Sequence, residues 1–242
     1  MKFVIFLGLL SVILPVFGEV KHSNKMPASF VSDCEKNFPT SEVILNFHDT
    51  PVEEDQKETI QSLTISARKS NIHSGKRYVL GLTTLKLSWG LDASFKLLRL
   101  SEPNVACARP QITIELKVID HKVHIARELP RNSCEYNFVR DHEYKHVNIN
   151  KDNMRQYSKE LIAAFKKQFP NRIIYGSYEK VDSEMKKTMN KKWTSFIEKA
   201  TAKMEIEGNK RHKALDSPEE YAKANTVCSG RIPSIFEAIE KK

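Results

Sequence analysis

Apolar and polar residues alternate over several stretches of the first half of the chain, a pattern typical of strands with one buried face. VILNF at 43–47 predicts a strand, and a helix is predicted after it over 53–70. The stretch 77–100 is rich in β-branched and aromatic residues and predicts one or two strands. QITIELKV at 111–118 predicts the first arm of a hairpin that turns at 120–121.

Helical spacing of apolar residues follows the predicted hairpin. Pro130 ends the last strand, Asn132 is a candidate N-cap, and Glu135 follows at the capping-box distance, so a helix is predicted from here to residue 169. A further helix is predicted over 183–207. Its apolar stripe at helical spacing indicates core packing and comprises Met185, Met189, Trp193, Phe196, Ile197, Ala200 and Met204.

A last helix is predicted near the C-terminus, where Ser217, Pro218 and Glu220 are cap, first-turn and capping-box residues. Together these elements predict an α+β fold. We expect a small, mostly antiparallel sheet packed against long helices.

The first 18 residues have the layout of a secretory signal peptide, because Lys2 precedes an apolar run from Phe3 to Phe17. We therefore expect residues 19–242 to form the mature chain as a single domain. Its strands and hairpin are expected at about 40–130 and its helices at about 132–242. The expected location is secreted or periplasmic. No stable insertion into a membrane is expected, since no second run of that length follows.

The chain carries 39 Lys and Arg against 30 Asp and Glu, a net charge of +9. The lysines are scattered through the helical segments and alternate with acidic residues. Such a distribution is typical of solvated helix faces rather than of a nucleic-acid surface. We expect no nucleic-acid partner, and we expect a monomer.

Four cysteines in a chain with a predicted signal peptide indicate disulfides, and no C-x-x-C motif is present. Cys107 and Cys134 lie at equal distances from the predicted turn at 120–121. This spacing favours a bond between Cys107 and Cys134 across the hairpin. It leaves Cys34 to pair with Cys228.

HEYKH at 142–146 is the segment that points most directly to chemistry. Residues four apart project from the same side of a helix, so His142 and His146 can bind one metal ion. Glu143 lies about 100° further round the helix, where the general base of a zinc peptidase holds the attacking water. One zinc ion is therefore the predicted cofactor.

The alternative is that HEYKH lies on a solvated helix face, and the phase of the helix distinguishes the two. Measured from His142, the apolar residues of this helix fall between about 60° and 140°. They are Tyr136, Val139, Val147, Met154, Leu161 and Phe165. Glu143, near about 100°, is central to this face, which is expected to turn inward. The phase of the helix therefore favours a metal site over a solvated helix face.

The third ligand is not fixed by the motif. The extended motif H-E-x-x-H-x-x-G-x-x-H would need Gly at 149, and this chain has Ile149, which leaves Asp152 a weak candidate. Downstream, His212 is the favoured candidate because it is neutral and precedes a helix start. The alternatives in that segment are Asp216, Glu219 and Glu220. The strand VHIARELP at 123–130 is expected to line the substrate cleft.

The segment from Cys107 to Ile149, with GLTT upstream and HKALDSPEEYAKANTVC downstream, resembles a group of bacterial secreted proteins described as predicted zinc-dependent peptidases. The resemblance covers roughly residues 80 to 228. It implies His142 and His146 as zinc ligands and Glu143 as catalytic base.

Three hypotheses follow for the whole protein. The favoured one is a secreted zinc metalloprotease that hydrolyses a peptide or protein substrate with Glu143 as general base. The second is a non-catalytic secreted module that binds metal or the cell envelope. The third is a structural domain in which HEYKH has no chemical role.

Overall fold

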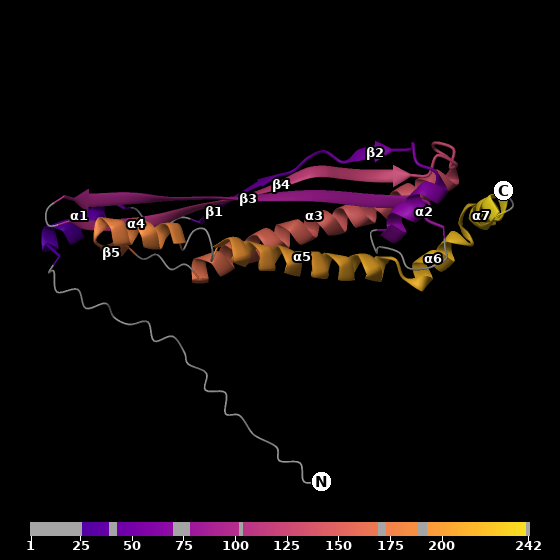
Figure 1. Ribbon diagram of the computed structural model, residues 1–242. Coiled ribbons are helices and arrows are strands. Elements are labelled where there is room, and N and C mark those ends of the chain that lie inside the picture. Colours follow the sequence, from indigo (N-terminus) through magenta and orange to yellow (C-terminus); the bar gives the residue numbers. More distant parts are fainter. Residues whose placement is uncertain are drawn as a thin grey trace, which may run out of the picture.

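The computed structural model describes residues 26–38, 43–69, 78–101, 104–168, 173–187 and 193–240. The predicted signal peptide, residues 1–18, lies outside these ranges. Helices and strands are mixed along the chain (Figure 1). The strands are β1 (Val43–His48), β2 (Glu53–Asp55), β3 (Gly81–Leu100), β4 (Val105–Ile125) and β5 (Ile174–Gly176). The helices are α1 (Ala28–Asn37), α2 (Ile60–Lys69), α3 (Cys134–Gln168), α4 (Tyr178–Lys187), α5 (Thr194–Leu215), α6 (Pro218–Ala224) and α7 (Arg231–Glu240), with the 3₁₀ helix η2 (Val227–Gly230).

β4 is the central strand of the sheet. β3 pairs with it antiparallel along its whole length, from Gly81 opposite Ile125 to Leu100 opposite Val105. On the other edge of β4, β1 and β2 pair parallel and β5 pairs antiparallel. The combination of helices and strands was predicted correctly. The sheet is mixed rather than mostly antiparallel. β1 and β2 do not form a hairpin with β3; both pair parallel with β4.

The hairpin predicted around residues 120–121 is wrong. β4 continues straight through this point, and the hairpin turn lies between β3 and β4. The register shifts here: Lys86 faces Asp120 and Leu87 faces Val118, so Ile119 is bulged out and is 63% exposed. A bulge reverses the alternation of inward and outward side chains, which in the sequence is hard to tell from a turn.

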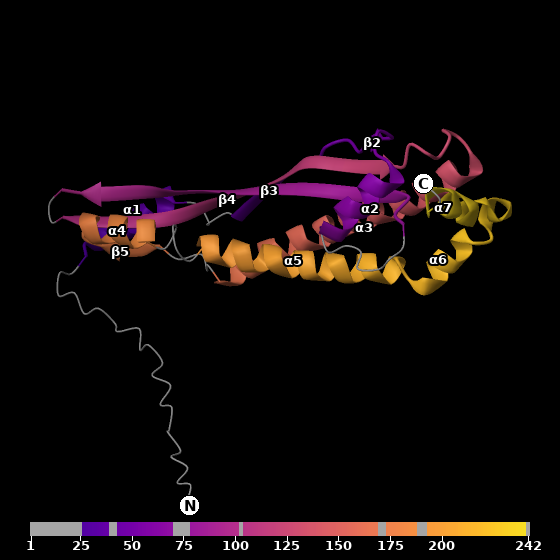
Figure 2. The same cartoon turned by 45° about the vertical axis from the view of Figure 1, so that its right-hand side comes forward.

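α3 and α5 lie side by side beneath β3 and β4 (Figures 1 and 2), on the face where α4 packs against Ala106 and Ala108. α1 packs against Val105 and Cys107, whose side chains point to the other face of the sheet. The predicted inward face of α3 is confirmed, since all six of its apolar residues named above are buried. Tyr136, Val139 and Val147 pack in one core cluster, and Met154, Leu161 and Phe165 pack in a second. The long helix therefore spans both halves of the core.

α5 runs antiparallel to α3, and Ile197 and Met204 of α5, with its N-cap residue Trp193, supply part of the second cluster. The single helix predicted over 183–207 corresponds to two helices, α4 and α5, and residue 189 lies outside the described residues. Gly208 marks a close approach of α5 to α3, because a Cβ there would lie 2.9 Å from Asn153 Nδ2.

Two local predictions need correction. The stretch 53–70 is not one helix, since its first residues form β2 and α2 begins at Ile60. The N-cap of α3 is Ser133 rather than Asn132: Ser133 Oγ accepts a hydrogen bond from the Tyr136 N–H at 3.1 Å. The start of α6 is as predicted, with Ser217 Oγ accepting from the Glu220 N–H.

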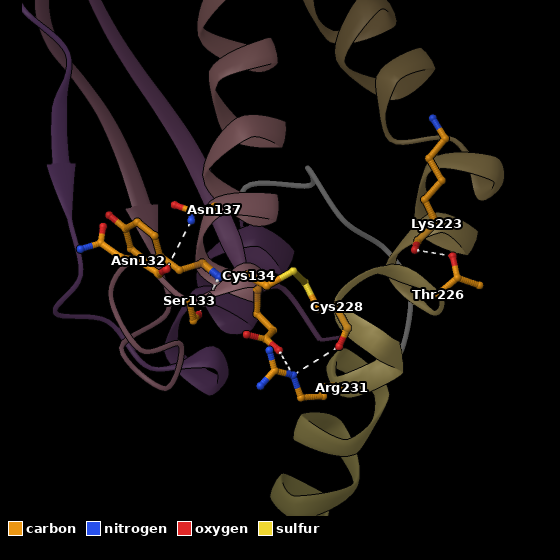
Figure 3. The surroundings of a disulfide bond; sticks show 10 residues. Asn132, Ser133, Cys134, Asn137, Lys223, Thr226, Cys228 and Arg231 are labelled. Carbon is orange, nitrogen blue, oxygen red and sulfur yellow. Dashed lines mark hydrogen bonds and ion pairs between the residues drawn. A yellow bond between two sulfur atoms is a disulfide. The ribbon is translucent and has the colours of Figure 1, made fainter.

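Both disulfides differ from the predicted pairing. Cys34 in α1 is bonded to Cys107 in β4, and Cys134 at the start of α3 is bonded to Cys228 in η2 (Figure 3). The predicted pairing was wrong because it rested on the hairpin at 120–121, which does not exist. Two disulfides are compatible with an oxidising compartment. Within the described residues, no helix has the length and apolar character needed to cross a membrane.

Candidate metal centre

Two pairs of side chains with helical i, i+4 spacing face each other where α3 and α5 pack together. His142 and His146 project from α3, and His212 and Asp216 lie at the C-terminal end of α5. Asp216 is the C-cap residue of α5, and its N–H donates to the carbonyl of His212 at 2.9 Å. The antiparallel packing of the two helices brings the pairs into contact.

His142, His146 and Asp216 form a group with the geometry of a metal site. The Nε2 atoms of both histidines lie 3.1 Å from the same oxygen, Asp216 Oδ1. One donor atom from each residue lies within 4.8 Å of the other two. Donor atoms at about 2.0–2.2 Å from a zinc ion lie about 3.3–3.6 Å apart in a tetrahedral site. The two separations of 3.1 Å are slightly shorter and would widen by a few tenths of an ångström around an ion.

The geometry favours Asp216 over His212 as the third ligand. The Nδ1 atom of His212 lies 2.8 Å from Nδ1 of His146, which is the ring nitrogen of His146 that does not face Asp216. The other ring nitrogen of His212 lies 2.9 Å from Asn150 Oδ1. Neither nitrogen of His212 therefore belongs to the group.

The remaining candidates lie outside this group. Asp152 is exposed and pairs with Arg155 at 3.3 Å, and Glu219 is exposed at the start of α6. Glu220 is engaged by Lys145 Nζ at 2.6 Å, and its Oε1 lies 3.7 Å from Nδ1 of His142. It contributes negative charge behind His142 without reaching the group.

The electrostatics of the group follow from burial and hydrogen bonding. Burial opposes the charged form of Asp216, but hydrogen bonds with His142 and His146 outweigh it and hold the pKa of Asp216 well below its usual range. Burial also opposes the protonated form of His142, yet the contact with Asp216 raises the pKa of His142. Burial and the neighbouring His146 lower the pKa of His212 to about 4, so His212 is neutral at physiological pH.

Glu143 projects from α3 towards β3 and is only 5% exposed. Its Oε2 lies 2.8 Å from the hydroxyl of Thr83, which fixes the carboxylate against the strand. Burial raises the pKa of Glu143, while His146, Thr83 and His142 act in the opposite direction. A Cβ at Gly81 would lie 2.7 Å from both Cγ and Oε1 of Glu143, so the missing side chain at Gly81 makes room for it.

The strand beside the motif helix is β3, not the predicted segment 123–130. Val123 pairs with Thr83 on one side and with Glu54 on the other, which places this part of β4 inside the sheet. Among the described residues, no strand pairs with the outer edge of β3. On the far side of α3, Glu54 Oε2 accepts hydrogen bonds from Arg140 and Tyr144, which hold the helix on β2.

Sequence reasoning missed three residues that shape this site: Gly81, Thr83 and Asn150. Asn150 lies one helical turn beyond His146, so its spacing from the motif was a usable signal. The GLTT segment contains Gly81 and Thr83, but its position beside HEYKH depends on a contact between β3 and α3 across 60 residues of sequence. No local pattern reports such a contact.

Comparisons of the chain with protein-family models, with curated proteins and with solved structures find no match. The resemblance to bacterial secreted peptidases therefore stays a prediction.

Proposed function

We propose that this protein is a secreted zinc-dependent hydrolase that cleaves peptide bonds, with His142, His146 and Asp216 as metal ligands. The observation that carries the proposal is the convergence of three donor atoms from α3 and the end of α5 beside a buried carboxylate, Glu143. Two imidazoles and one carboxylate are a donor set that zinc accepts, and three protein ligands are typical of catalytic rather than structural zinc sites. A bound zinc ion supplies Lewis-acid chemistry, because it polarises a carbonyl and lowers the pKa of water.

The protein's own part in the reaction is to bind, orient and move a proton. Glu143 takes a proton from the attacking water and passes it to the leaving amine. Its burial raises the pKa of Glu143 above the ordinary value of a glutamate, which makes the carboxylate a stronger proton acceptor. Thr83 holds the carboxylate in one orientation through the contact at 2.8 Å.

The sheet supports a peptide as substrate. An extended peptide can add to an unpaired strand edge through backbone hydrogen bonds. The outer edge of β3 is such an edge among the described residues, and Thr83 in β3 touches the proposed base. A peptide paired there would run past the site rather than away from it.

The first test measures metal content and hydrolysis together. Wild-type protein is expected to hold about one equivalent of zinc and to hydrolyse an unfolded, fluorescently labelled protein substrate. Glu143→Gln is expected to keep the zinc and to lose hydrolysis by about 10²–10⁴-fold, because only the proton transfer is removed. His142→Ala should lose both.

Asp152→Asn is the matched control, because it neutralises a carboxylate of the same helix that lies outside the group. It should change neither zinc content nor hydrolysis. A wild-type protein that takes up no zinc contradicts the proposal, and so does full hydrolysis by Glu143→Gln.

A second candidate is a structural metal site that holds α5 and α6 on α3. The low exposure of the ligand side chains, 18% for His142, 10% for His146 and 22% for Asp216, favours it. In that case Glu143→Gln would leave every measured property of the metal-loaded protein intact. Removal of zinc with a chelator would lower the unfolding temperature, and no hydrolysis would be found.

A further inference from the structure

A chain of hydrogen-bonding side chains leads away from the candidate metal centre. It starts at Nδ1 of His146, which lies 2.8 Å from Nδ1 of His212. Nε2 of His212 lies 2.9 Å from Asn150 Oδ1, and Asn150 Nδ2 lies 3.3 Å from Nε2 of His121. The chain ends in the core, since His121 is 1% exposed. The proposed ligand set and base use none of the last three residues.

The direction of the chain is fixed by its first member. Nε2 of His146 faces Asp216. A metal ion bound at this nitrogen would leave the ring proton of His146 on Nδ1. Nδ1 of His212 then accepts a hydrogen bond from this N–H, and the ring proton of His212 is on Nε2. Asn150 Oδ1 accepts from that Nε2–H, which turns the Asn150 amide nitrogen towards His121. His212 and Asn150 therefore each accept one hydrogen bond and donate one along the chain, and His121 accepts the last one at Nε2.

Both packed helices and the sheet hold the chain in place. Asn150 lies one turn beyond His146 on α3, and His212 lies one turn before Asp216 on α5. His121 belongs to β4, directly after the bulge at Ile119 that turns it inward. A displacement of any of these elements would break the contact at Nδ1 of His146.

We propose that His212 and Asn150 are positioning residues that hold His146 in the tautomer with its proton on Nδ1, and so present Nε2 to the metal. The inference rests on the proposed function, because it takes the centre formed by His142, His146 and Asp216 to be a metal site. In metalloproteins, a hydrogen bond to the second ring nitrogen fixes the orientation of a histidine ligand, and its loss weakens metal binding by about 10–100-fold. Here a neutral histidine, itself held by an amide, is the acceptor.

The test compares zinc dissociation constants, measured by competition with a chromophoric chelator. His212→Ala is expected to weaken zinc binding by about 10–100-fold while the stoichiometry stays at one ion. His212→Asn is expected to recover most of this loss, because its amide oxygen can accept from Nδ1 of His146. Asn150→Ala should weaken binding less, and its effect should not add to that of His212→Ala, since both act through one chain. His48→Asn, a change at an exposed histidine on β1, is the control and should leave the dissociation constant unchanged.

Two spectroscopic measurements separate a positioning role from a ligand role. X-ray absorption of the zinc-loaded protein should show the same two imidazoles in wild type and in His212→Ala. Long-range nitrogen–proton NMR spectra should place the ring proton of His146 on Nδ1 and that of His212 on Nε2 in the wild type.

The outcomes are distinct. If the wild type binds zinc and His212→Ala binds it with the same dissociation constant, the inference is overturned but the proposed function is not. Loss of one imidazole from the zinc shell in that variant also overturns it, because His212 would then be a ligand. A wild-type chain that binds no zinc overturns the proposed function and the inference together.

Discussion

At the scale of single residues, Gly81 is the position where one added methyl group reaches the site most directly. A Cβ there would lie 2.7 Å from Cγ and Oε1 of Glu143 and from Cγ1 of Val139. Both neighbours are buried on α3 and cannot swing into solvent. Such overpacking typically costs about 1–3 kcal/mol. The backbone or the proposed base must therefore move when this glycine is replaced.

Gly81→Ala is expected to lower the unfolding free energy by about 1–3 kcal/mol and to lower hydrolysis at least about tenfold, with zinc content unchanged. Denaturant unfolding and a hydrolysis assay measure the two effects. Gly90→Ala on the same strand is the matched control, because its Cβ would meet Glu115 Cβ at an ordinary 3.7 Å. Equal behaviour of the two variants would show that Glu143 is not held against β3.

The residues of the site were predictable where one helix carries them. His142, Glu143 and His146 follow from spacing alone, and the apolar phase of α3 correctly turns Glu143 inward. The third position was harder, because His212 and Asp216 lie one turn apart on the same helix. Which of the two faces His142 depends on the position of α5 along the axis of α3. No local sequence pattern predicts this position.

At the scale of elements, the helix pair α3 and α5 sets the geometry of the centre, and Gly208 sets how closely the pair approaches. Asn153 Nδ2 donates to the carbonyl of Met204 at 3.1 Å and would lie 2.9 Å from a Cβ at Gly208. Glycine in a helix interior is usually about 1 kcal/mol less stable than alanine. Glycine is less stable than alanine at position 208 as far as helix propensity goes, but only glycine permits the close approach of Asn153.

Gly208→Ala is therefore expected to weaken zinc binding several-fold and to forfeit the stability that alanine normally adds to a helix, because α5 must shift against α3. The double variant Gly208→Ala with Asn153→Ala removes the clash and should restore zinc affinity. Dissociation constants and unfolding free energies of the four proteins in this cycle provide the measurement. Additive effects of the two changes would disprove the close-approach argument.

The elements themselves divide into those with local signals and those without. α3 was predictable because an apolar stripe and the stop at Pro170 bound it in sequence. The hairpin was misplaced because of the bulge at Ile119. Even-numbered residues of β4 are buried from Ile112 to Val118 and odd-numbered ones from His121 onwards, and this change resembles a turn in the sequence. The parallel partners β1 and β2 could not be predicted, since their pairing with β4 spans about seventy residues.

At the scale of the whole molecule, the two disulfides hold opposite ends of an elongated structure (Figure 1). The bond between Cys34 and Cys107 joins α1 to the start of β4, far from the candidate metal centre. The bond between Cys134 and Cys228 joins the start of the motif helix to the segment after α6. Arg231, which follows η2, adds an ion pair with Glu135 at 2.7 Å (Figure 3). This second bond therefore fastens the chain that carries Asp216 to the helix that carries both histidines.

The two bonds close loops of similar size, with sequence separations of 73 and 94, so their entropic contributions to stability differ by only about 0.2 kcal/mol. Replacing either pair by serine should lower the unfolding free energy by a similar amount, about 2–5 kcal/mol. Zinc affinity should respond differently. The double variant of Cys134 and Cys228 should bind zinc at least about tenfold more weakly, because Asp216 loses its anchorage to α3, whereas the double variant of Cys34 and Cys107 should match the wild type. Chelator competition, carried out below the unfolding temperature of both variants, checks this. Equal zinc affinity in the two double variants would mean that packing of α5 on α3 alone holds Asp216 in place.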